Sequence, residues 1–223
     1  MINKKIFIIA EIGVNHNGKI SEAFKLIDEA KKCGANAVKF QTFITDELVS
    51  KNAPMAEHHK KNIQKKTSHY NILKKLELNF NDFIKLKKYT KNNKMKFIST
   101  PYDIRSLLFL IKIKSDYIKF ASSELLNFPM LDIARKSSIP IILSTGMSNL
   151  KEVVESINFV LEKNKNLIVL KCTSDYPAKI EELNLNSFKS LQEIFRNKIT
   201  YGFSDHSIGS IAAITSLKFN VKF

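Results

Sequence analysis

Hydrophobic residues recur along the chain in seven short runs that do not alternate cleanly with polar residues. The runs cover residues 6–11, 37–41, 95–100, 117–122, 139–145, 167–174 and 199–205. Near-continuous apolar runs of this length are typical of parallel strands that are covered on one or both faces. We therefore predict seven strands.

Amphipathic helical patterns lie between these runs. Residues 21–33 place Ala23, Leu26, Ile27 and Ala30 on one face, with Ser21 predicted as the N-cap and Gly34 as the stop. A second clear pattern follows Ser148 over residues 148–163. Further helices are predicted over 70–92, 104–113, 129–137, 187–196 and 208–218.

A strand followed by a helix, repeated seven times, requires a parallel sheet, either open and doubly wound or closed as a barrel. Gly13 and Gly18 after the first strand do not fit the GxGxxG fingerprint of a dinucleotide-binding sheet. Polar residues stand at the carboxyl end of every predicted strand, and in a barrel these ends meet at one mouth. The pattern favours one α/β domain over residues 1–223, a TIM (β/α)8-type barrel that lacks strand eight.

The composition of the chain indicates the cellular location that we expect. The chain has 223 residues, two widely separated cysteines and no apolar run of the roughly 18 residues that span a bilayer. The apolar stretch near the N-terminus is too short for a signal peptide, so we expect a reducing cytoplasmic location and no membrane partner.

The net charge of +15 comes from 36 Lys and Arg against 21 Asp and Glu. Only three of the basic residues are arginine, and the lysines are scattered among asparagines and isoleucines. The densest run, residues 58–66, is predicted to be a solvated face. We therefore expect no nucleic-acid partner, although a positive field favours anionic substrates.

Two lysines, Lys39 and Lys119, stand inside predicted strands near their carboxyl ends. A buried lysine is costly unless it meets an anion, although an edge lysine can also snorkel to solvent. Hydroxyl donors follow at the ends of neighbouring strands, namely Thr100, Ser122, Ser144 and Ser204. The pattern predicts a pocket for a carboxylate or a phosphate. It also leaves open a Schiff base on one lysine, as in aldolases.

Other polar residues near the predicted mouth are further candidates for the site. Glu11 either makes a loop hydrogen bond or orients a hydroxyl-rich substrate, and Glu124 is a candidate acid or base. His16 lies in the turn-forming NHNG, and His206 is either a metal ligand, a base or a turn cap. Segment 42–69 is too long for a bare connection and suggests a lid.

Seven motifs occur in order along the chain: AEIGVNHNG, AVKFQTF, FISTPYD, YIKFASSEL, PIILSTGM, CTSDYP and GFSDHSIG. Together they strongly resemble the N-acetylneuraminate (sialic acid) synthase family, which includes legionaminate and pseudaminate synthases. The resemblance implies condensation of phosphoenolpyruvate with an N-acetylated hexose such as N-acetylmannosamine, giving a nine-carbon sugar acid and phosphate. It also implies a TIM barrel, a domain-swapped homodimer and a C-terminal antifreeze-like domain.

The resemblance assigns roles to individual residues. Those that would hold phosphoenolpyruvate are Lys39, Thr100, Lys119, Ser122, Ser144 and Ser204. Those that would contact the open-chain sugar are Glu11, Gln41 and Tyr176. Glu124 would accept a proton from the attacking water, with Lys119 as the other catalytic residue.

The resemblance also implies a divalent metal, Mn²⁺, held by His206 and by a second histidine on strand eight. After His206 the chain runs through SIAAITSLKF to NVKF, without that histidine. We therefore expect half of a metal site, strands one and seven with unpaired edges, and no antifreeze-like domain. The alternatives to a synthase are an inactive fragment or anion-binding module and a lysine Schiff-base aldolase. The sequence does not select the acceptor sugar.

Overall fold

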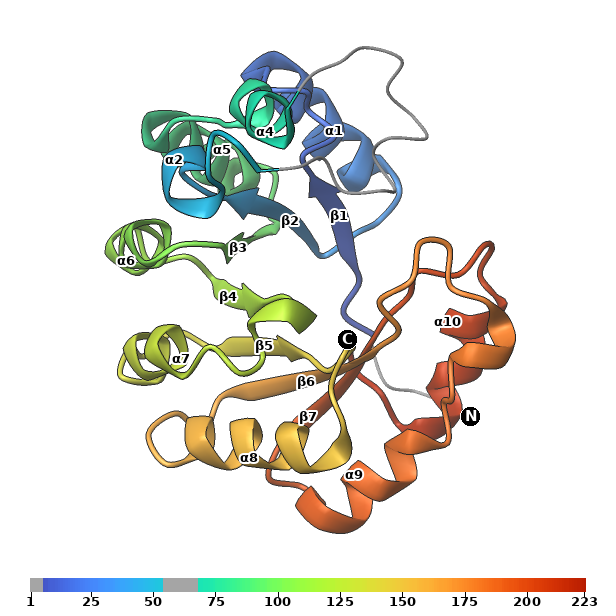
Figure 1. The fold of residues 1–223 in the computed structure, drawn as a ribbon. Helices are drawn as coiled ribbons and strands as arrows, with labels where there is room; N and C mark the ends of the chain where they lie inside the picture. Colours follow the sequence, from blue (N-terminus) through green and yellow to red (C-terminus); the bar gives the residue numbers. More distant parts are fainter. Residues whose placement is uncertain (1–5, 54–67) are drawn as a thin grey trace. The chain divides into compact units, whose positions relative to one another are not determined.

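The computed structural model describes residues 6–53 and 68–223, and these form two compact units. The first unit is Ala10–Ser115, and the second joins the residues up to Ile9 to Asp116–Phe223. Both consist of parallel strands that alternate with helices, as the sequence pattern predicts (Figure 1).

The first unit contains three strands, which neighbour one another in chain order. Its elements are β1 (Ile9–Gly13), α1 (Ile20–Lys32), β2 (Ala37–Thr42), α2 (Thr45–Leu48), α4 (His69–Leu76), α5 (Phe80–Asn92), β3 (Lys96–Pro101) and α6 (Ile104–Lys112). The register of β2 and β3 places Gln41 opposite Thr100. Phe40, Phe83 and Phe97 are fully buried and pack ring against ring, which fixes the strands under their helices.

The second unit contains four strands, again parallel and in chain order. Its elements are β4 (Tyr117–Phe120), η1 (Ser122–Glu124), α7 (Phe128–Arg135), β5 (Ile141–Ser144), α8 (Leu150–Leu161), β6 (Leu167–Cys172), η2 (Ile180–Glu182), α9 (Ser187–Phe195), β7 (Thr200–Ser204), α10 (Ile211–Ser216) and η3 (Leu217–Phe219). Helices α7, α8 and α9 cover one side of the strands (Figure 1). The register places Cys172 opposite Ser204, so the polar ends of β6 and β7 are level.

The predicted helix caps are partly wrong. Helix α1 begins at Ile20 after Lys19, with no side-chain cap, so Ser21 lies inside the helix. Helix α8 is capped by Asn149 and not by Ser148, because Asn149 and Glu152 form a reciprocal capping box. Gly34 does stop α1, with the left-handed φ of +82° that a glycine adopts without strain.

The single helix predicted over residues 70–92 is two helices, α4 and α5. The break is at Glu77, Leu78 and Asn79, where Asn79 accepts a hydrogen bond from the Asp82 backbone and starts the second helix. The helix predicted over 208–218 shortens to α10 and continues as the 3₁₀ turn η3. Within segment 42–69, which the sequence predicts as a lid, the structure shows α2. Residues 54–67, which include the basic run 58–66, lie outside the described residues.

The seven predicted strands are confirmed, but the prediction of an unpaired edge at β7 is wrong. The Lys222 backbone N–H donates to Tyr201 O at 2.8 Å, and the Phe203 N–H donates to Phe223 O at 2.9 Å. On its other side this terminal segment accepts a hydrogen bond from the Phe7 N–H, at 2.8 Å to Lys222 O. Residues 221–223 therefore lie beside β7 as the first residues of an eighth strand would.

A glycine makes this close approach possible. A Cβ atom placed on Gly202 would lie 2.8 Å from Phe223 Cβ and 2.4 Å from a methyl carbon of Leu170. Phe223 packs its ring against Phe7 and Tyr117, with centroid distances of 4.8 and 6.0 Å. Within the part of the chain that the structure describes, no helix combines the length and the apolar character needed to cross a membrane.

The capping box of α8 gives a test of the local structure. Replacing Asn149 with alanine removes the acceptor for the Glu152 N–H, so we expect the free energy of unfolding to fall by about 1 kcal/mol. Ser148→Ala is the matched control and should change it by less than about 0.5 kcal/mol. Chemical denaturation of both variants checks this, and equal losses would contradict the assignment of the cap.

Candidate functional site

The carboxyl ends of the strands in the first unit bring together four of the predicted site residues. The Lys39 ammonium lies 2.5 Å from Glu11 Oε2 and donates to Thr100 Oγ1 at 3.2 Å. Gln41 follows on the same face of β2, two residues after Lys39, because side chains alternate along a strand. The four residues Glu11, Lys39, Gln41 and Thr100 thus form one polar cluster.

The ion pair changes the interpretation of Lys39. The sequence predicts an anion for this lysine because it stands inside an apolar strand. In the structure 13% of its side chain is exposed, and the Glu11 carboxylate supplies the negative charge. Glu11 is itself half exposed, with 50% of its side chain accessible. The Glu11 side of the pair is therefore open to solvent, whereas Lys39 is largely enclosed.

His16 is buried in the loop between β1 and α1, which the sequence leaves as a turn residue. Its ring is 1% exposed, and Nδ1 accepts a hydrogen bond from the Gly18 backbone N–H at 3.1 Å. A backbone N–H only donates, so the neutral ring carries its proton on Nε2. Nε2 has no hydrogen-bond partner among the described residues, and burial lowers the pKa of His16.

The second unit gathers a larger cluster around Lys119. This lysine is 6% exposed, and its ammonium donates to Ser144 Oγ at 2.6 Å and to the Phe120 carbonyl at 2.8 Å. Lys119 lies on β4 and Ser144 ends β5, so the pairing of these two strands places the hydroxyl over the ammonium. A buried cation with oxygen partners of this kind attracts an anion strongly, because little water screens its charge.

Gly146, just after β5, lies against serine hydroxyls that follow β4 and β6. The Gly146 N–H donates to Ser122 Oγ at 3.1 Å, and a Cβ on Gly146 would lie 2.3 Å from Ser174 Oγ. Two hydroxyls therefore converge on the space beside Gly146. Ser174 is absent from the predicted site, although it is the last residue of the predicted strand 167–174, and this position was the available signal.

His206 follows the end of β7 and has a defined tautomer. Its Nδ1 lies 2.8 Å from Thr173 O, and a carbonyl only accepts, so Nδ1 carries a proton. The exposed ring of Tyr176 stacks on the imidazole at a centroid distance of 4.2 Å. In the neutral ring, Nε2 keeps its lone pair and lies 3.4 Å from Ser204 Oγ. The second unit thus brings together Lys119, Ser122, Ser144, Tyr176, Ser204 and His206.

Cys172 ends β6 inside this cluster, with Sγ 3.9 Å from His206 Nδ1. Burial alone raises the pKa of the thiol, but the interactions with His206, Ser122 and Lys119 outweigh burial and lower the pKa to about 7. The hydrogen bond with Cys172 in turn raises the pKa of His206, against the effect of burial. No pattern in the sequence indicates a role for this cysteine.

Glu124 lies in the 3₁₀ turn η1, which starts at Ser122. Its carboxylate accepts hydrogen bonds from Asn127 Nδ2 at 2.7 Å and from Ser123 Oγ at 3.4 Å. Asn127 also caps α7, so these contacts orient the carboxylate from the helix side. A catalytic role for Glu124 stays a prediction.

The metal prediction has one candidate ligand in the structure. In residues 6–53 and 68–223, no three His, Cys, Asp or Glu side chains cluster as a metal-binding group. The chemistry of His206 nevertheless fits one ligand, because Thr173 fixes its tautomer and leaves Nε2 as the donor atom.

Comparison with known proteins decides the family. The model of the NeuB family matches residues 26–222. The chain belongs to the NeuB family. This confirms the resemblance drawn from the seven motifs. Glu11 and His16 precede the matched range, whereas the polar ends of β2 to β7 fall within it.

The relatives of this NeuB-family chain include named synthases. The chain is 40% identical to the N,N'-diacetyllegionaminic acid synthase of Legionella pneumophila, over 91% of the chain and 58% of the relative. It is 30% identical to the human N-acetylneuraminate-9-phosphate synthase, over 97% of the chain and 60% of the relative. The chain therefore spans about 60% of the length of the curated relatives that it matches.

A solved structure confirms the fold class. The N-acetylneuraminic acid synthetase of Leptospira borgpetersenii, solved in complex with citrate, superposes with a TM-score of 0.85 at 30% identity. The match covers 99% of this chain and 72% of the other. The NeuB-family chain thus has the TIM-barrel type of fold that its strand and helix pattern predicts.

The buried His16 predicts a pH dependence of stability. Burial lowers the pKa of His16 in the folded state below its ordinary value of 6.5, so the unfolded chain binds the proton more readily. The stabilising contribution is present above pH 6.5, and it is lost as the pH falls from 6.5 through the lower folded-state pKa. Protonation of Nδ1 also breaks the bond from Gly18.

His16→Asn tests this, because an amide oxygen at the position of Nδ1 still accepts from Gly18 and does not titrate. We expect the free energy of unfolding of this variant to fall less steeply between pH 7 and pH 5 than that of the unchanged chain. Denaturant titrations at several pH values measure both slopes. Parallel slopes would show that His16 does not contribute.

Proposed function

We propose that this NeuB-family chain provides the catalytic barrel of a synthase that condenses phosphoenolpyruvate with an N-acetylated hexose. The reaction would form a nine-carbon sugar acid of the sialic acid type and release phosphate. The observation that carries the proposal is the buried Lys119 ammonium, which donates to the hydroxyl of Ser144, with the hydroxyls of Ser122 and Ser174 beside the nearby Gly146. Phosphoenolpyruvate carries a phosphate and a carboxylate, and both suit such a pocket.

The relatives support the choice of reaction class. They include proteins named N,N'-diacetyllegionaminic acid synthase, pseudaminic acid synthase and N-acetylneuraminate-9-phosphate synthase. The solved relative from Leptospira borgpetersenii contains citrate, a small molecule with several carboxylates. The identity of the N-acetylated sugar stays open, since relatives with different products match this chain at 30 to 40% identity.

In the proposed mechanism, the second unit binds phosphoenolpyruvate through Lys119, Ser122, Ser144 and Ser204. The family resemblance also assigns Lys39 and Thr100 to phosphoenolpyruvate, and Lys39 is proposed to exchange Glu11 for a substrate anion. Glu11, Gln41 and Tyr176 are proposed to bind the hydroxyls of the open-chain sugar. Binding both substrates with fixed orientation brings the enol carbon toward the aldehyde carbon.

The proposed chemistry forms one carbon–carbon bond and replaces the carbon–oxygen bond to phosphate with a carbon–oxygen bond to the oxygen of water. The methylene carbon of phosphoenolpyruvate attacks the aldehyde, and water adds to the carbon that carries the phosphate. Glu124 is proposed to accept the proton of this water. Collapse of the resulting adduct releases phosphate, whose negative charge Lys119 and the nearby hydroxyls stabilise as it leaves.

A divalent metal is part of the proposal, and Mn²⁺ is our choice. When bound, it would polarise the aldehyde oxygen. His206 would hold it through Nε2, because the Nδ1 hydrogen bond to Thr173 keeps that lone pair available. The proposal also includes a second copy of the chain as partner and a cytoplasmic location.

The contacts of Lys119 favour anion binding over a Schiff base. Its nitrogen donates to two oxygen acceptors, one of them a carbonyl, and this stabilises the charged ammonium. A nucleophilic lysine requires the neutral amine instead.

Replacing Lys119 with methionine tests the anion pocket. We expect the affinity for phosphoenolpyruvate to fall by roughly tenfold or more, because a charged hydrogen bond in a buried site contributes about 1.5–3 kcal/mol. Calorimetric titration measures this, and Lys151→Met, on the exposed part of α8, is the control that should bind unchanged. Equal affinities in both variants would refute the pocket. Binding without phosphate release in the presence of N-acetylmannosamine would instead favour an anion-binding module.

Glu124→Gln tests the proposed proton acceptor. The amide keeps the size and the contact with Asn127 but accepts no proton, so turnover should fall by about 10²-fold or more. The affinity for phosphoenolpyruvate should change little. Phosphate release and calorimetry separate the two effects. A loss of affinity with no loss of turnover per bound substrate would mean that Glu124 only supports the turn.

A further inference from the structure

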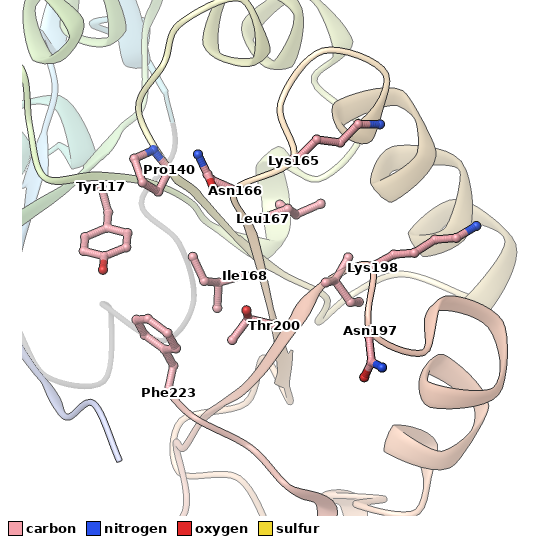
Figure 2. A pocket seen from close by; sticks show the side chains of 11 residues that line it. Tyr117, Pro140, Lys165, Asn166, Leu167, Ile168, Asn197, Lys198, Thr200 and Phe223 are labelled. Carbon is pink, nitrogen blue, oxygen red and sulfur yellow. The ribbon is translucent and has the colours of Figure 1, made fainter. Parts of the chain in front are cut away.

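A pocket lies at the ends of the second unit's strands that are opposite the cluster around Lys119. It has a volume of about 280 Å³ and is lined by residues that begin or precede β4, β5, β6 and β7, together with Phe223 (Figure 2). Tyr117 begins β4, Leu167 begins β6 and Thr200 begins β7. Strand β6 has six residues, so its two ends are about 16 Å apart. The pocket is therefore distinct from the cluster around Lys119.

Two basic loops form the rim of this pocket. The loop before β6 contributes Lys165 and Asn166, and the loop before β7 contributes Asn197 and Lys198. The same loops carry two further cations, Lys163 and Arg196. None of the lining residues is an aspartate or a glutamate.

The ends of α8 and α9 work against this positive charge but are too weak to cancel it. Each helix C-terminus is equivalent to about half a negative charge. Lys165 already donates to the carbonyl of Leu161, the last residue of α8. Glu162 in the loop before β6 is paired with Arg135, so the four cations of the two loops stand against roughly one negative charge from the helix ends. The rim stays positive, and charge complementarity favours an anionic ligand.

The opposite wall is aromatic. Tyr117 and Phe223 stand close together, with ring centroids 6.0 Å apart and an angle of 72° between the rings. Figure 2 shows these rings on one side of the pocket and Lys165 and Lys198 on the other, with Ile168 and Thr200 between them and both ammonium groups pointing outward, away from the rings. An aromatic wall suits the C–H face of a sugar ring, and the asparagine amides and Thr200 suit its hydroxyls.

We propose that this pocket binds an anionic sugar, meaning a sugar ring that carries a phosphate or a carboxylate. The anionic group lies at the Lys165 and Lys198 rim, and the ring lies over Tyr117 and Phe223. This inference does not depend on the proposed synthase reaction, because it concerns the opposite ends of the strands. The ligand contacts β6, β7 and the terminal residue together, so it stabilises the folded second unit by mass action.

Residue-resolved NMR titration of the chain tests the proposal. The probes are glucose 6-phosphate, glucuronate, inorganic phosphate and glucose. We expect both anionic sugars to shift the amide signals of Asn166, Asn197 and Thr200, with half-saturation at millimolar concentration or below. Glucose and inorganic phosphate should bind several-fold more weakly. Shifts at Gly146 report on the cluster around Lys119. They therefore distinguish binding at that cluster from binding at this pocket.

Variants of the rim complete the test. Lys165→Met and Lys198→Met should each weaken binding by about two- to fivefold, as expected for partly exposed ion pairs. Lys189→Met, near the other end of α9, is the matched control and should bind normally. Because Lys165 also contacts Leu161, the Lys198 variant decides if the first one unfolds.

Several results would overturn the proposal. One is the lack of shifts at the pocket with either anionic sugar. Another is equal binding of glucose and glucose 6-phosphate, which would show that the anionic group is not recognised. Equal binding of inorganic phosphate and glucose 6-phosphate would show that the sugar ring is not recognised. Unchanged affinity in the Lys198 variant would show that the basic rim does not hold the ligand.

Discussion

The direction shared by parallel strands is the constraint on which the candidate sites of this chain depend. Because neighbouring strands in each unit run the same way, their last side chains emerge at one end and their first side chains at the other. Lys119 and Ser144 meet because β4 and β5 are parallel and in register. In the same way, Cys172 and His206 meet because β6 and β7 end level with each other.

Electrostatics then separates the two lysines that the sequence treats alike. Lys119 contacts a hydroxyl and a carbonyl, whose dipoles solvate its charge. Lys39 is paired with the Glu11 carboxylate, and an anion that binds there must displace that partner. Opening this ion pair adds a cost to anion binding at Lys39.

Much of this arrangement is readable from the sequence, since the strands and most helices follow from apolar periodicity alone. The failures have physical causes. Asn149 outcompetes Ser148 as a cap because Glu152 stands three residues further on and reciprocates. The burial of His16 and the ion pair of Glu11 depend on how loops fold back on strands, which no local pattern specifies. The pairing of residues 221–223 depends on an open neighbour at β7 and on Gly202, which are brought near only by the fold.

The hydrogen bond from Phe7 to Lys222 brings the two extremities of the described backbone into contact. Backbone segments that lie side by side at these two extremities favour circular permutation, because a linker between them does not cross the interior. A new opening at Gly209, an exposed glycine with φ of +88° between β7 and α10, would then leave every strand intact. Such a rearranged chain would begin at α10 and would carry the segment of residues 221–223 as an internal strand, covalently continuous with β1.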